Sequence, residues 1–266
     1  MEETIFGKIA EIEGNNQTAA LCTVVRSRGS TPRGSASKMI VFPNGEIQGT
    51  VGGGEMENRV IIEAIEAIRQ NESKYIEYSM VDPERGDPGV CGGQVEIFIE
   101  PINPRPLLLV IGGGHVGRAV SRLGNWLGFR VVMSDDRIDY CNPENNPYAE
   151  EFYPVLMEEL PGQLEITPWT YIVLTTRGVD IDVPGLPGLL QSKAAYFGVI
   201  GSRRRWATTC EKLREIGIND RVLAKVHSPV GLDIHAEIPE EIAVSIMAEI
   251  IMLRRGGDGK PMVAPS

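Results

Sequence analysis

The sequence predicts an α/β protein in which a smaller N-terminal α+β domain precedes a C-terminal domain with a doubly wound parallel sheet. Apolar strands alternate with amphipathic helices over residues 107–255, and short links join them, as is typical of parallel sheets. Residues 1–100 are mostly β-rich. Pro101, Pro104 and Pro106 interrupt the chain between these regions, because proline lacks the N–H that helices and sheet ladders use. We therefore expect domains at 1–103 and 104–256 and a disordered tail at 257–266.

The first domain carries several local signals. Asn44-Gly45 tolerates positive φ and predicts a hairpin between two short strands. Val95, Ile97 and Ile99 alternate with polar residues, which is the period of a half-buried strand. Together the signals predict helices at 2–13 and 57–70 and strands at 21–26, 38–42, 46–51 and 94–100.

The second domain opens with an unbroken apolar run at 107–111, which is typical of a strand covered on both faces. The final helix has clear ends, since Pro239 suits its first turn and Gly256 suits the position after its last turn. We expect helices at 115–127, 203–216 and 239–254, and strands at 107–111, 130–134, 171–175 and 196–200.

Composition excludes several function classes. The 26 basic and 36 acidic side chains give a net charge of −10, which disfavours nucleic acid and an anionic membrane surface as partners. No apolar run approaches the ~20 residues of a membrane span, and the N-terminus does not resemble a signal peptide, so we expect a cytoplasmic protein. The widely spaced cysteines (Cys22, Cys91, Cys141 and Cys210) are expected to be free thiols. The histidines His115, His227 and His235 have no zinc-type spacing, and no metal site is predicted.

The sharpest motif is the glycine-rich segment at 112–117, which follows an apolar strand and opens a helix. Gly112, Gly114 and Gly117 satisfy G-x-G-x-x-G, with roles in the tight turn, the approach of a pyrophosphate, and the packing of helix on strand. Asp135 and Asp136 end the next strand, where an acid could bind ribose hydroxyls. The pattern favours a Rossmann-like phosphate site, and a Rossmann-like shell without a ligand is the alternative. His115 is either a ligand contact or a solvent-facing helix residue.

Two further glycine clusters lie in the first domain. Gly52, Gly53 and Gly54 precede a helix, which suits either an anion-binding concavity or a packing turn. Cys91 precedes two glycines, so its thiol is either a small buried apolar group or a contact for a soft metal or sulfur.

Arginines gather at two places in this acidic chain. Arg26, Arg28 and Arg33 surround one loop, which is either a site for an anionic ligand or a solvated basic loop. Ser202 and Arg203 begin a helix directly after a strand, a position that can bind phosphate, although a charged helix surface would look the same.

Taken together, the motifs resemble the XdhC/CoxI-type accessory factors of xanthine dehydrogenase and related molybdenum hydroxylases. The resemblance extends from about Thr23 to Arg255. It rests on the segments Val25-Arg26, Gly29–Arg33, Gly49–Gly54, Glu57, Cys91–Gly93, Gly112–Gly117, Asp135–Arg137, Thr176–Gly178, Gly198, Ile200–Arg204, Pro229–Ile234, Ala236-Glu237 and Pro239–Ile246.

The resemblance implies a cytosolic, non-catalytic chaperone that binds molybdenum cofactor of the molybdopterin type. Such a protein presents the cofactor for sulfuration by a cysteine desulfurase and helps to insert it into a xanthine dehydrogenase-type molybdoenzyme. The site residues that it implies in the second domain are Gly112, Gly113, Gly114, His115, Gly117, Asp135, Asp136, Arg137, Arg177, Ser202 and Arg203. Those in the first domain are Arg26, Arg33, Gly53, Gly54, Glu55, Glu57 and Cys91. We expect Arg26, Arg33, Glu55, Glu57 and Cys91 to line a second, smaller polar surface that faces the Rossmann-like domain.

The chain departs from the family pattern at three positions. Glu55 stands where the family usually has cysteine, Val179 where it often has histidine, and His235 where it has glycine, while Asp182 matches the family acid. The loss of a soft ligand and an imidazole weakens direct metal coordination. Two alternatives remain: an NAD(P)-dependent oxidoreductase that uses the Rossmann-like site, and a scaffold whose site is vestigial.

We also expect a homodimer. The predicted helix at 57–70 and the β-rich first domain hold much apolar surface for about 100 residues, and so small a domain leaves a sizeable share exposed. Two-fold dimers are also the commonest soluble oligomers.

Overall fold

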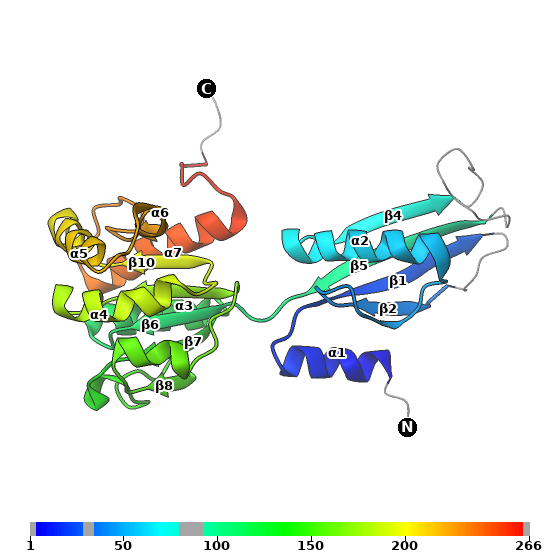
Figure 1. The fold of residues 1–266 in the computed structure, drawn as a ribbon. Helices are drawn as coiled ribbons and strands as arrows, with labels where there is room; N and C mark the ends of the chain where they lie inside the picture. Colours follow the sequence, from blue (N-terminus) through cyan, green and yellow to red (C-terminus); the bar gives the residue numbers. More distant parts are fainter. Residues whose placement is uncertain (1–3, 29–34, 80–92, 263–266) are drawn as a thin grey trace. The chain divides into compact units, whose positions relative to one another are not determined.

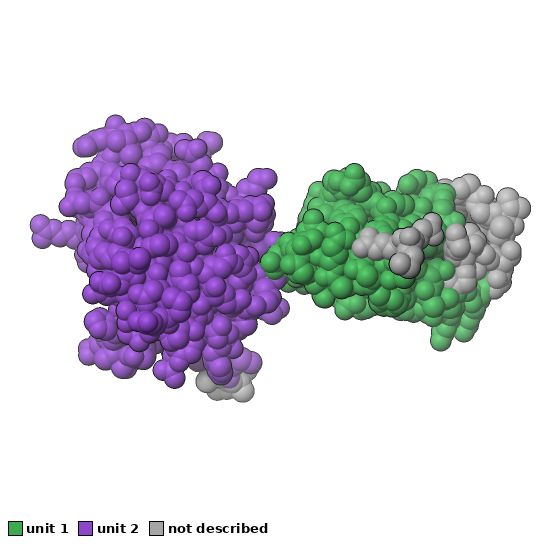
Figure 2. Space-filling view, turned by 90° about the horizontal axis from the view of Figure 1, so that it is seen from below, with its two compact units in different colours: residues 1–104 green, residues 105–266 purple. Residues whose placement is uncertain are grey.

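The computed structural model describes residues 4–28, 35–79 and 93–262. The chain divides into two compact units, Met1–Pro104 and Arg105–Ser266, and each is described by itself below (Figure 2). Within the described residues, no helix has both the length and the apolar character needed to cross a lipid bilayer.

Unit 1 is a five-stranded antiparallel sheet with the strand order β3-β2-β1-β5-β4 (Figure 1). Its strands are β1 (Ala19–Arg28), β2 (Lys38–Val41), β3 (Ile47–Gly49), β4 (Lys74–Ser79) and β5 (Gln94–Ile102). The helix α2 (Gly54–Gln70) packs on one face, where Val60 and Ala64 meet the inward residues of β1 and β5. The shorter helix α1 (Ile5–Gly14) packs on other residues of the sheet through Ile12, which contacts Ala19 and Ile40.

The expected hairpin is present, but two details of unit 1 differ from the sequence prediction. The edge strand β4 was not predicted. The strand β5 does not end before Pro101, which pairs with Ala20 of β1. The proline is tolerated because β4 first pairs with β5 at Ile99, so Pro101 has no neighbouring strand on that side.

Unit 2 is a six-stranded parallel sheet with the order β11-β10-β9-β6-β7-β8, the doubly wound Rossmann order. This result and the smaller unit 1 confirm the predicted fold class. The strands are β6 (Leu107–Ile111), β7 (Arg130–Ser134), β8 (Glu151–Tyr153), β9 (Thr170–Leu174), β10 (Tyr196–Val199) and β11 (Val226–His227). The helices are α3 (His115–Trp126), α4 (Val179–Leu190), α5 (Arg203–Glu215), α6 (Asp220–Leu223) and α7 (Pro239–Arg255), with short 3-10 helices η2 (Ile138–Tyr140) and η3 (Met157–Gly162).

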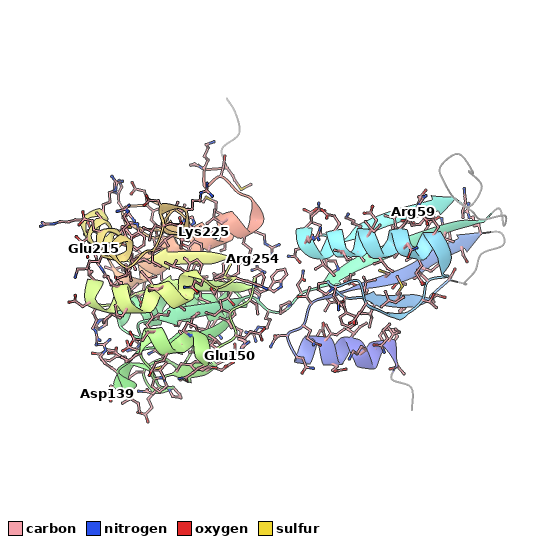
Figure 3. All side chains as sticks on the ribbon, viewed as in Figure 1. Arg59, Asp139, Glu150, Glu215, Lys225 and Arg254 are labelled. Carbon is pink, nitrogen blue, oxygen red and sulfur yellow. The ribbon has the colours of Figure 1, made fainter. Side chains whose placement is uncertain are left out.

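The central strand β6 is buried on both faces and divides two cores. Leu108 and Val110 pack under α3 and α7, whereas Leu109 and Ile111 pack under η3, α4 and α5. Arg254, at the end of α7, is labelled in Figure 3. Its guanidinium lies 5.4 Å from the centre of the Phe129 ring. The strand β6, which leads into α3, therefore lies between two packed layers.

Some elements of unit 2 were missed for identifiable reasons. The helix α4 contains Pro184 and Pro187, which ordinarily argue against a helix interior. The strands β8 and β11 have three and two residues, too few to show a period. The expected tail begins with an ordered contact, because the Gly257 N–H donates to the Met252 carbonyl at 2.9 Å. Residues 263–266 lie outside the described residues.

A buried carboxylate anchors the segment that leads from β11 into α7. Glu249 is 9% exposed and accepts hydrogen bonds from the Tyr196 hydroxyl and the Gly231 N–H, both at 2.7 Å. His227 Nδ1 lies 2.9 Å from the same carboxylate, and the His227 ring stacks on Tyr196. Burial and the bond to Glu249 raise the pKa of Tyr196, so its hydroxyl stays protonated and donates.

We expect Glu249→Ala to lower the free energy of unfolding of unit 2 by about 2–3 kcal/mol, because it leaves buried donors without an acceptor. All three tryptophans lie in this unit, so urea unfolding followed by tryptophan fluorescence reports on it selectively. Glu240→Ala, on the exposed side of the same helix, is the control. Equal stability of the two variants would contradict the anchoring role of Glu249.

Candidate functional site

The glycine loop between β6 and α3 is shaped by the rest of unit 2. Gly112 has a φ of +112°, and a side chain there would lie 2.6 Å from the Thr175 carbonyl oxygen at the end of β9. At Gly117 a Cβ would collide with the carbonyl oxygen of Gly112, so this glycine lets the helix pack against the turn. Thr175 further ties the loop to β9, because its hydroxyl donates to the Gly112 carbonyl at 2.6 Å. These contacts support the roles expected for the first and third glycines of the motif.

Gly114 differs from its neighbours. It caps the N-terminus of α3 with a φ of −68°, and nothing lies within 4 Å of the position a Cβ would take. Neither the backbone nor the packing of this chain therefore requires glycine at 114. Open space at this position allows another molecule to approach the backbone. The first N–H groups of α3 have no intrahelical acceptor, and together with the helix dipole they favour an anion such as phosphate.

Asp135 holds the loop from the end of β7. Its side chain accepts four hydrogen bonds of 2.9–3.0 Å, one from the Gly113 N–H and three from the backbone and guanidinium of Arg137. Burial alone would raise the pKa of this carboxyl, but the bonds from Arg137 and Gly113 outweigh burial and hold the pKa below its usual value. Four bonds fill the lone-pair sites of a carboxylate. The sequence suggested that an acid at this strand end binds ribose hydroxyls, and in this structure the carboxylate of Asp135 is hydrogen-bonded to Gly113 and Arg137 instead.

The neighbouring acid is paired as well. Both oxygens of Asp136 lie within 3.0 Å of the Arg177 guanidinium, which comes from the loop after β9. Arg137 lies over the Tyr140 ring, 3.8 Å from its centre. A hollow of about 110 Å³ beside Gly112 is lined by both aspartates and both arginines. This volume is small for a nucleoside, because ligand pockets usually measure ~300–1,000 Å³.

A larger hollow of about 270 Å³ lies on the other side of the glycine loop, between the start of α3 and the segment 139–145. Gly113, Gly114, His115 and Arg118 line it from the helix side. His115 is exposed and lines this hollow, so its position fits both interpretations, a ligand contact and a solvent-facing helix residue.

The predicted site residues at the start of α5 do not make the buried contact at that place. Ser202 caps the helix by accepting from the Arg205 N–H at 3.2 Å, and Arg203 is exposed. The buried contact belongs to Arg205, which donates to the fully buried Asp182 at 2.6 Å and to Thr176 at 2.7 Å. Asp182, the acid that matches the family, therefore clamps α5 to the loop after β9 and is a positioning residue.

In unit 1 the glycines before α2 form a second open loop. Gly53 and Gly54 have φ values of +88° and +70°, and nothing lies within 4 Å of their Cβ positions. Glu57 occupies the helix start, since it accepts from the Thr50 hydroxyl and from the Val51 N–H at 3.3 Å. Glu55 is exposed and lies 3.6 Å from Arg59, which Figure 3 labels. Two carboxylates at this helix start make the loop less suited to an anion than the glycine loop of unit 2.

The other predicted residues of unit 1 do not join this loop. Arg26 pairs with Glu96 at 3.2 Å, and Glu96 alternates along β5 with Val95 and Ile97, which face α2. Arg26 thus lies on the sheet face opposite α2, whereas Glu57 lies at the start of α2, so these residues do not line one surface. Arg33 and Cys91 lie outside the described residues.

The cysteines that the structure describes are buried thiols. Burial raises the pKa of Cys22 to about 12 and also raises the pKa values of Cys141 and Cys210. In the same part of the chain, no three His, Cys, Asp or Glu side chains gather in a way that could hold a metal ion. These thiols are therefore unreactive at neutral pH.

Val179 and His235, the two other residues that depart from the family pattern, lie at positions that the structure describes. Val179 is the first residue of α4 and is half-buried. His235 is exposed and has a φ of +56°, a left-handed conformation that favours glycine, and its nearest charged partner is Asp233 at 3.8 Å. The histidine thus occupies a backbone position suited to glycine, without a buried contact.

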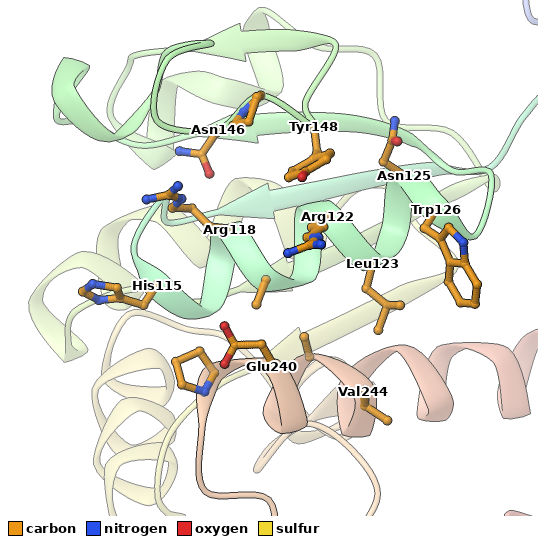
Figure 4. Close-up of a pocket in the computed structure, with 14 residues that line it drawn as sticks. His115, Arg118, Arg122, Leu123, Asn125, Trp126, Asn146, Tyr148, Glu240 and Val244 are labelled. Atoms are coloured by element: carbon orange, nitrogen blue, oxygen red, sulfur yellow. The ribbon is translucent and has the colours of Figure 1, made fainter.

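Sequence reasoning missed residues that line the outer side of α3. Arg118 and Arg122, spaced by one helical turn, follow His115, and Asn146 and Tyr148 face them from the segment before β8 (Figure 4). The spacing of the two arginines could have been read from the sequence. Nothing in the sequence indicates that Asn146 and Tyr148 lie beside them.

Fold and site together define a two-unit protein in which a Rossmann domain with an open glycine position at the start of α3 is linked to a smaller antiparallel α+β domain. Comparison with known families identifies it further. The model of the XdhC Rossmann domain matches residues 108–250, and that of the XdhC and CoxI family matches residues 13–79. The chain belongs to the XdhC and CoxI family, as the sequence motifs predicted.

Three curated relatives are similar to this chain. The Escherichia coli uncharacterized protein YqeB is 35% identical over 98% of this chain and 48% of its own length. A Bacillus subtilis protein, named as a probable subunit of xanthine dehydrogenase, is 31% identical over 60% of this chain and 46% of its own length. The Escherichia coli molybdenum cofactor insertion chaperone PaoD is 23% identical over 99% of this chain and 92% of its own length. The chain thus spans about half the length of the first two.

A solved structure supports the fold. The crystal structure of a Bacillus halodurans protein described as a xanthine dehydrogenase superposes with a TM-score of 0.52 at 20% identity, over 97% of each chain. The comparisons give no support to the NAD(P)-dependent oxidoreductase.

Replacing Asp135 should change the response of unit 2 to acid. Because the pKa of Asp135 is lowered by folding, its contribution to stability is present above the unfolded value of ~3.9 and is lost as the pH falls through the folded value. We expect Asp135→Asn to lower the free energy of unfolding at pH 7 by about 1–3 kcal/mol and to flatten its fall below about pH 4. Urea unfolding by tryptophan fluorescence between pH 7 and pH 2 measures both effects.

Asp139→Asn is the matched control, because it removes an exposed carboxyl from the same connection. A pH profile for Asp135→Asn that runs parallel to that of the unchanged protein would show that this carboxylate does not stabilise the loop.

Proposed function

We propose that this protein is a chaperone that binds molybdenum cofactor of the molybdopterin type and assists the maturation of a xanthine dehydrogenase-type enzyme. Membership of the XdhC and CoxI family and similarity to a molybdenum cofactor insertion chaperone support this proposal. The cofactor is the cargo here, and the chain needs only to hold, orient and release it.

The observation that carries the proposal is the open backbone at Gly114. The loop is fixed by Asp135, Thr175 and the packing of Gly117, and Gly114, which caps the helix, is the one glycine of the loop whose Cβ position is open. We call the open space at Gly114 the cradle. A phosphate fits the cradle because the N–H groups at the helix start and the helix dipole favour an anion there. The molybdopterin phosphate supplies such a group, and Arg118 and His115 stand beside the cradle.

The residues of this chain supply binding and orientation. The N–H groups at the start of α3 hold the phosphate, while Asp135 and Arg137 keep the loop in the shape that presents them. Arg177 and Ser202–Arg203 follow neighbouring strands at the same edge of the sheet, and we assign them to the oxygen-rich parts of the cargo. No side chain of the described residues is required to act as a nucleophile in this scheme.

Sulfuration of the bound cofactor by a cysteine desulfurase is part of the proposal. The sulfur path does not use Cys22, Cys141 or Cys210, because burial keeps these thiols protonated. Nor does it use position 55, where a glutamate replaces the usual family cysteine. The desulfurase therefore delivers sulfur directly to the cargo, or through Cys91. We place the protein in the cytoplasm, in keeping with buried cysteines that form no disulfide among the described residues.

Gly114→Val should remove the cargo while leaving the fold intact, because a valine side chain would occupy the cradle and nothing lies within 4 Å of the position of its Cβ. Protein purified from a molybdenum-replete host should contain molybdenum and pterin, and the variant should contain about tenfold less. Molybdenum is measured by mass spectrometry and pterin by the fluorescence of its oxidised product.

Gly162→Val, in a position that is also open and exposed, is the control and should keep the cargo. A folded Gly114→Val variant that retains as much molybdenum and pterin as the control would contradict the placement. An unchanged protein that carries neither would contradict the proposed function.

We further propose that the protein is a homodimer. Val25, Tyr75 and Phe98 are exposed hydrophobic residues of unit 1, and burying them would stabilise association. The charge of −10 per chain opposes association unless the acidic faces stay outside the interface. An interface of ~1,600 Å² would be of standard size.

Light scattering at micromolar protein and physiological salt should give the mass of two chains, and the mass of one chain would refute the dimer.

A further inference from the structure

A groove runs along the outer side of α3 and continues the hollow at the glycine loop. It has a volume of about 860 Å³ and lies between the segment 146–148, α3 and the first turns of α7 (Figure 4). His115 and Arg118 line both the hollow and the groove, so the two form one continuous surface. The combined space is large enough for a ligand of nucleotide size.

The groove presents cations at helical spacing. Arg118 and Arg122 lie one turn apart on α3 and are exposed, and Arg122 lies 5.7 Å from the centre of the Tyr148 ring. Figure 4 shows both arginines on the side of α3 that faces Asn146 and Tyr148. Glu240 is the acid in the groove and belongs to α7, on the opposite side. An arginine beside an aromatic ring offers a base both a charge and a stacking surface.

A second observation points to a ligand that donates hydrogen bonds. Asn146 is 1% exposed, and its Oδ1 has no hydrogen-bond partner. The orientation of the amide is fixed, because Nδ2 donates to the Tyr140 carbonyl at 2.6 Å and faces the Gly113 carbonyl at 3.4 Å. A buried acceptor without a partner is costly, and a hydroxyl or amino group of a bound molecule would remove that cost.

We propose that this groove binds a ribonucleoside phosphate. The phosphate lies at the start of α3 beside His115 and Arg118, a sugar hydroxyl or base amino group donates to Asn146, and the base lies against Arg122 and Tyr148. Inorganic phosphate alone would use only the first of these contacts. The nucleoside phosphate is either a free nucleotide or the nucleotide part of a larger cofactor. Only the second case rests on the proposed chaperone function.

Calorimetric titration of the full chain with CMP, GMP, AMP and inorganic phosphate tests the proposal. At least one mononucleotide should bind about tenfold more tightly than phosphate. The double variant Arg118→Gln/Arg122→Gln should bind that nucleotide about tenfold more weakly, since it loses two charge-assisted contacts. Tyr148→Leu keeps the charges and should weaken the nucleotide but not phosphate. Arg221→Gln, an exposed arginine that lines none of the three hollows, is the matched control and should change the affinity less than about twofold.

Equal affinity for phosphate and all three nucleotides, or equal losses in the double variant and the control, would overturn the proposal. All four replaced side chains are exposed, and tryptophan fluorescence confirms that each variant is folded. Nucleotide released from protein purified with and without molybdate then identifies the source: a free nucleotide is present in both preparations, whereas the nucleotide part of a cofactor disappears without molybdate. Molybdenum content is measured separately, so loss of the chaperone function and loss of the nucleotide site give different results.

Discussion

The carboxylate of Asp135 fixes the glycine loop on which the proposed site depends. It binds the Gly113 N–H and the guanidinium of Arg137, and these partners hold its pKa low, so the bond network persists across neutral pH. Gly112 is held in turn against the end of β9, and Gly117 against Gly112. With these positions fixed, the space around the Cβ position of Gly114 at the start of α3 stays open. The loop is therefore held in one shape, and the phosphate binding that we propose would not require it to be ordered first.

The same network decides on which side of the loop a ligand fits. Pairing of Asp135 with Arg137 and of Asp136 with Arg177 leaves a space of only about 110 Å³ beside Gly112. The side that faces His115 and Arg118 is more open and continues into the groove along α3. The phosphate site that we propose for this Rossmann sheet thus lies on the outer side of the helix. In the proposed function, the cargo is held and released on this more open side.

Much of the fold could be predicted because local signals agree with tertiary packing. The apolar run at 107–111, the glycines that follow it and the capped helix at 239–255 all take their predicted form. The prediction was incomplete where packing overrides local preference: α4 tolerates Pro184 and Pro187, and β11 consists of two residues. The site was predicted at the glycines but not at Asn146 or Tyr148, because contacts between distant segments leave no trace in one sequence. The hydrogen bonds of Asp135 to Gly113 and Arg137 could not be predicted, since spacing reveals the position of an acid but not its partners.

The most direct test of the central claim is a crystal structure of the protein purified from a molybdenum-replete host with its cargo bound. The account predicts that a phosphate of the cargo lies within hydrogen-bonding distance, roughly 3 Å, of the N–H groups at Gly114 and His115, on the side that Arg118 lines. A phosphate bound instead beside Asp136 and Arg177, or at the glycines before α2 in unit 1, would contradict it.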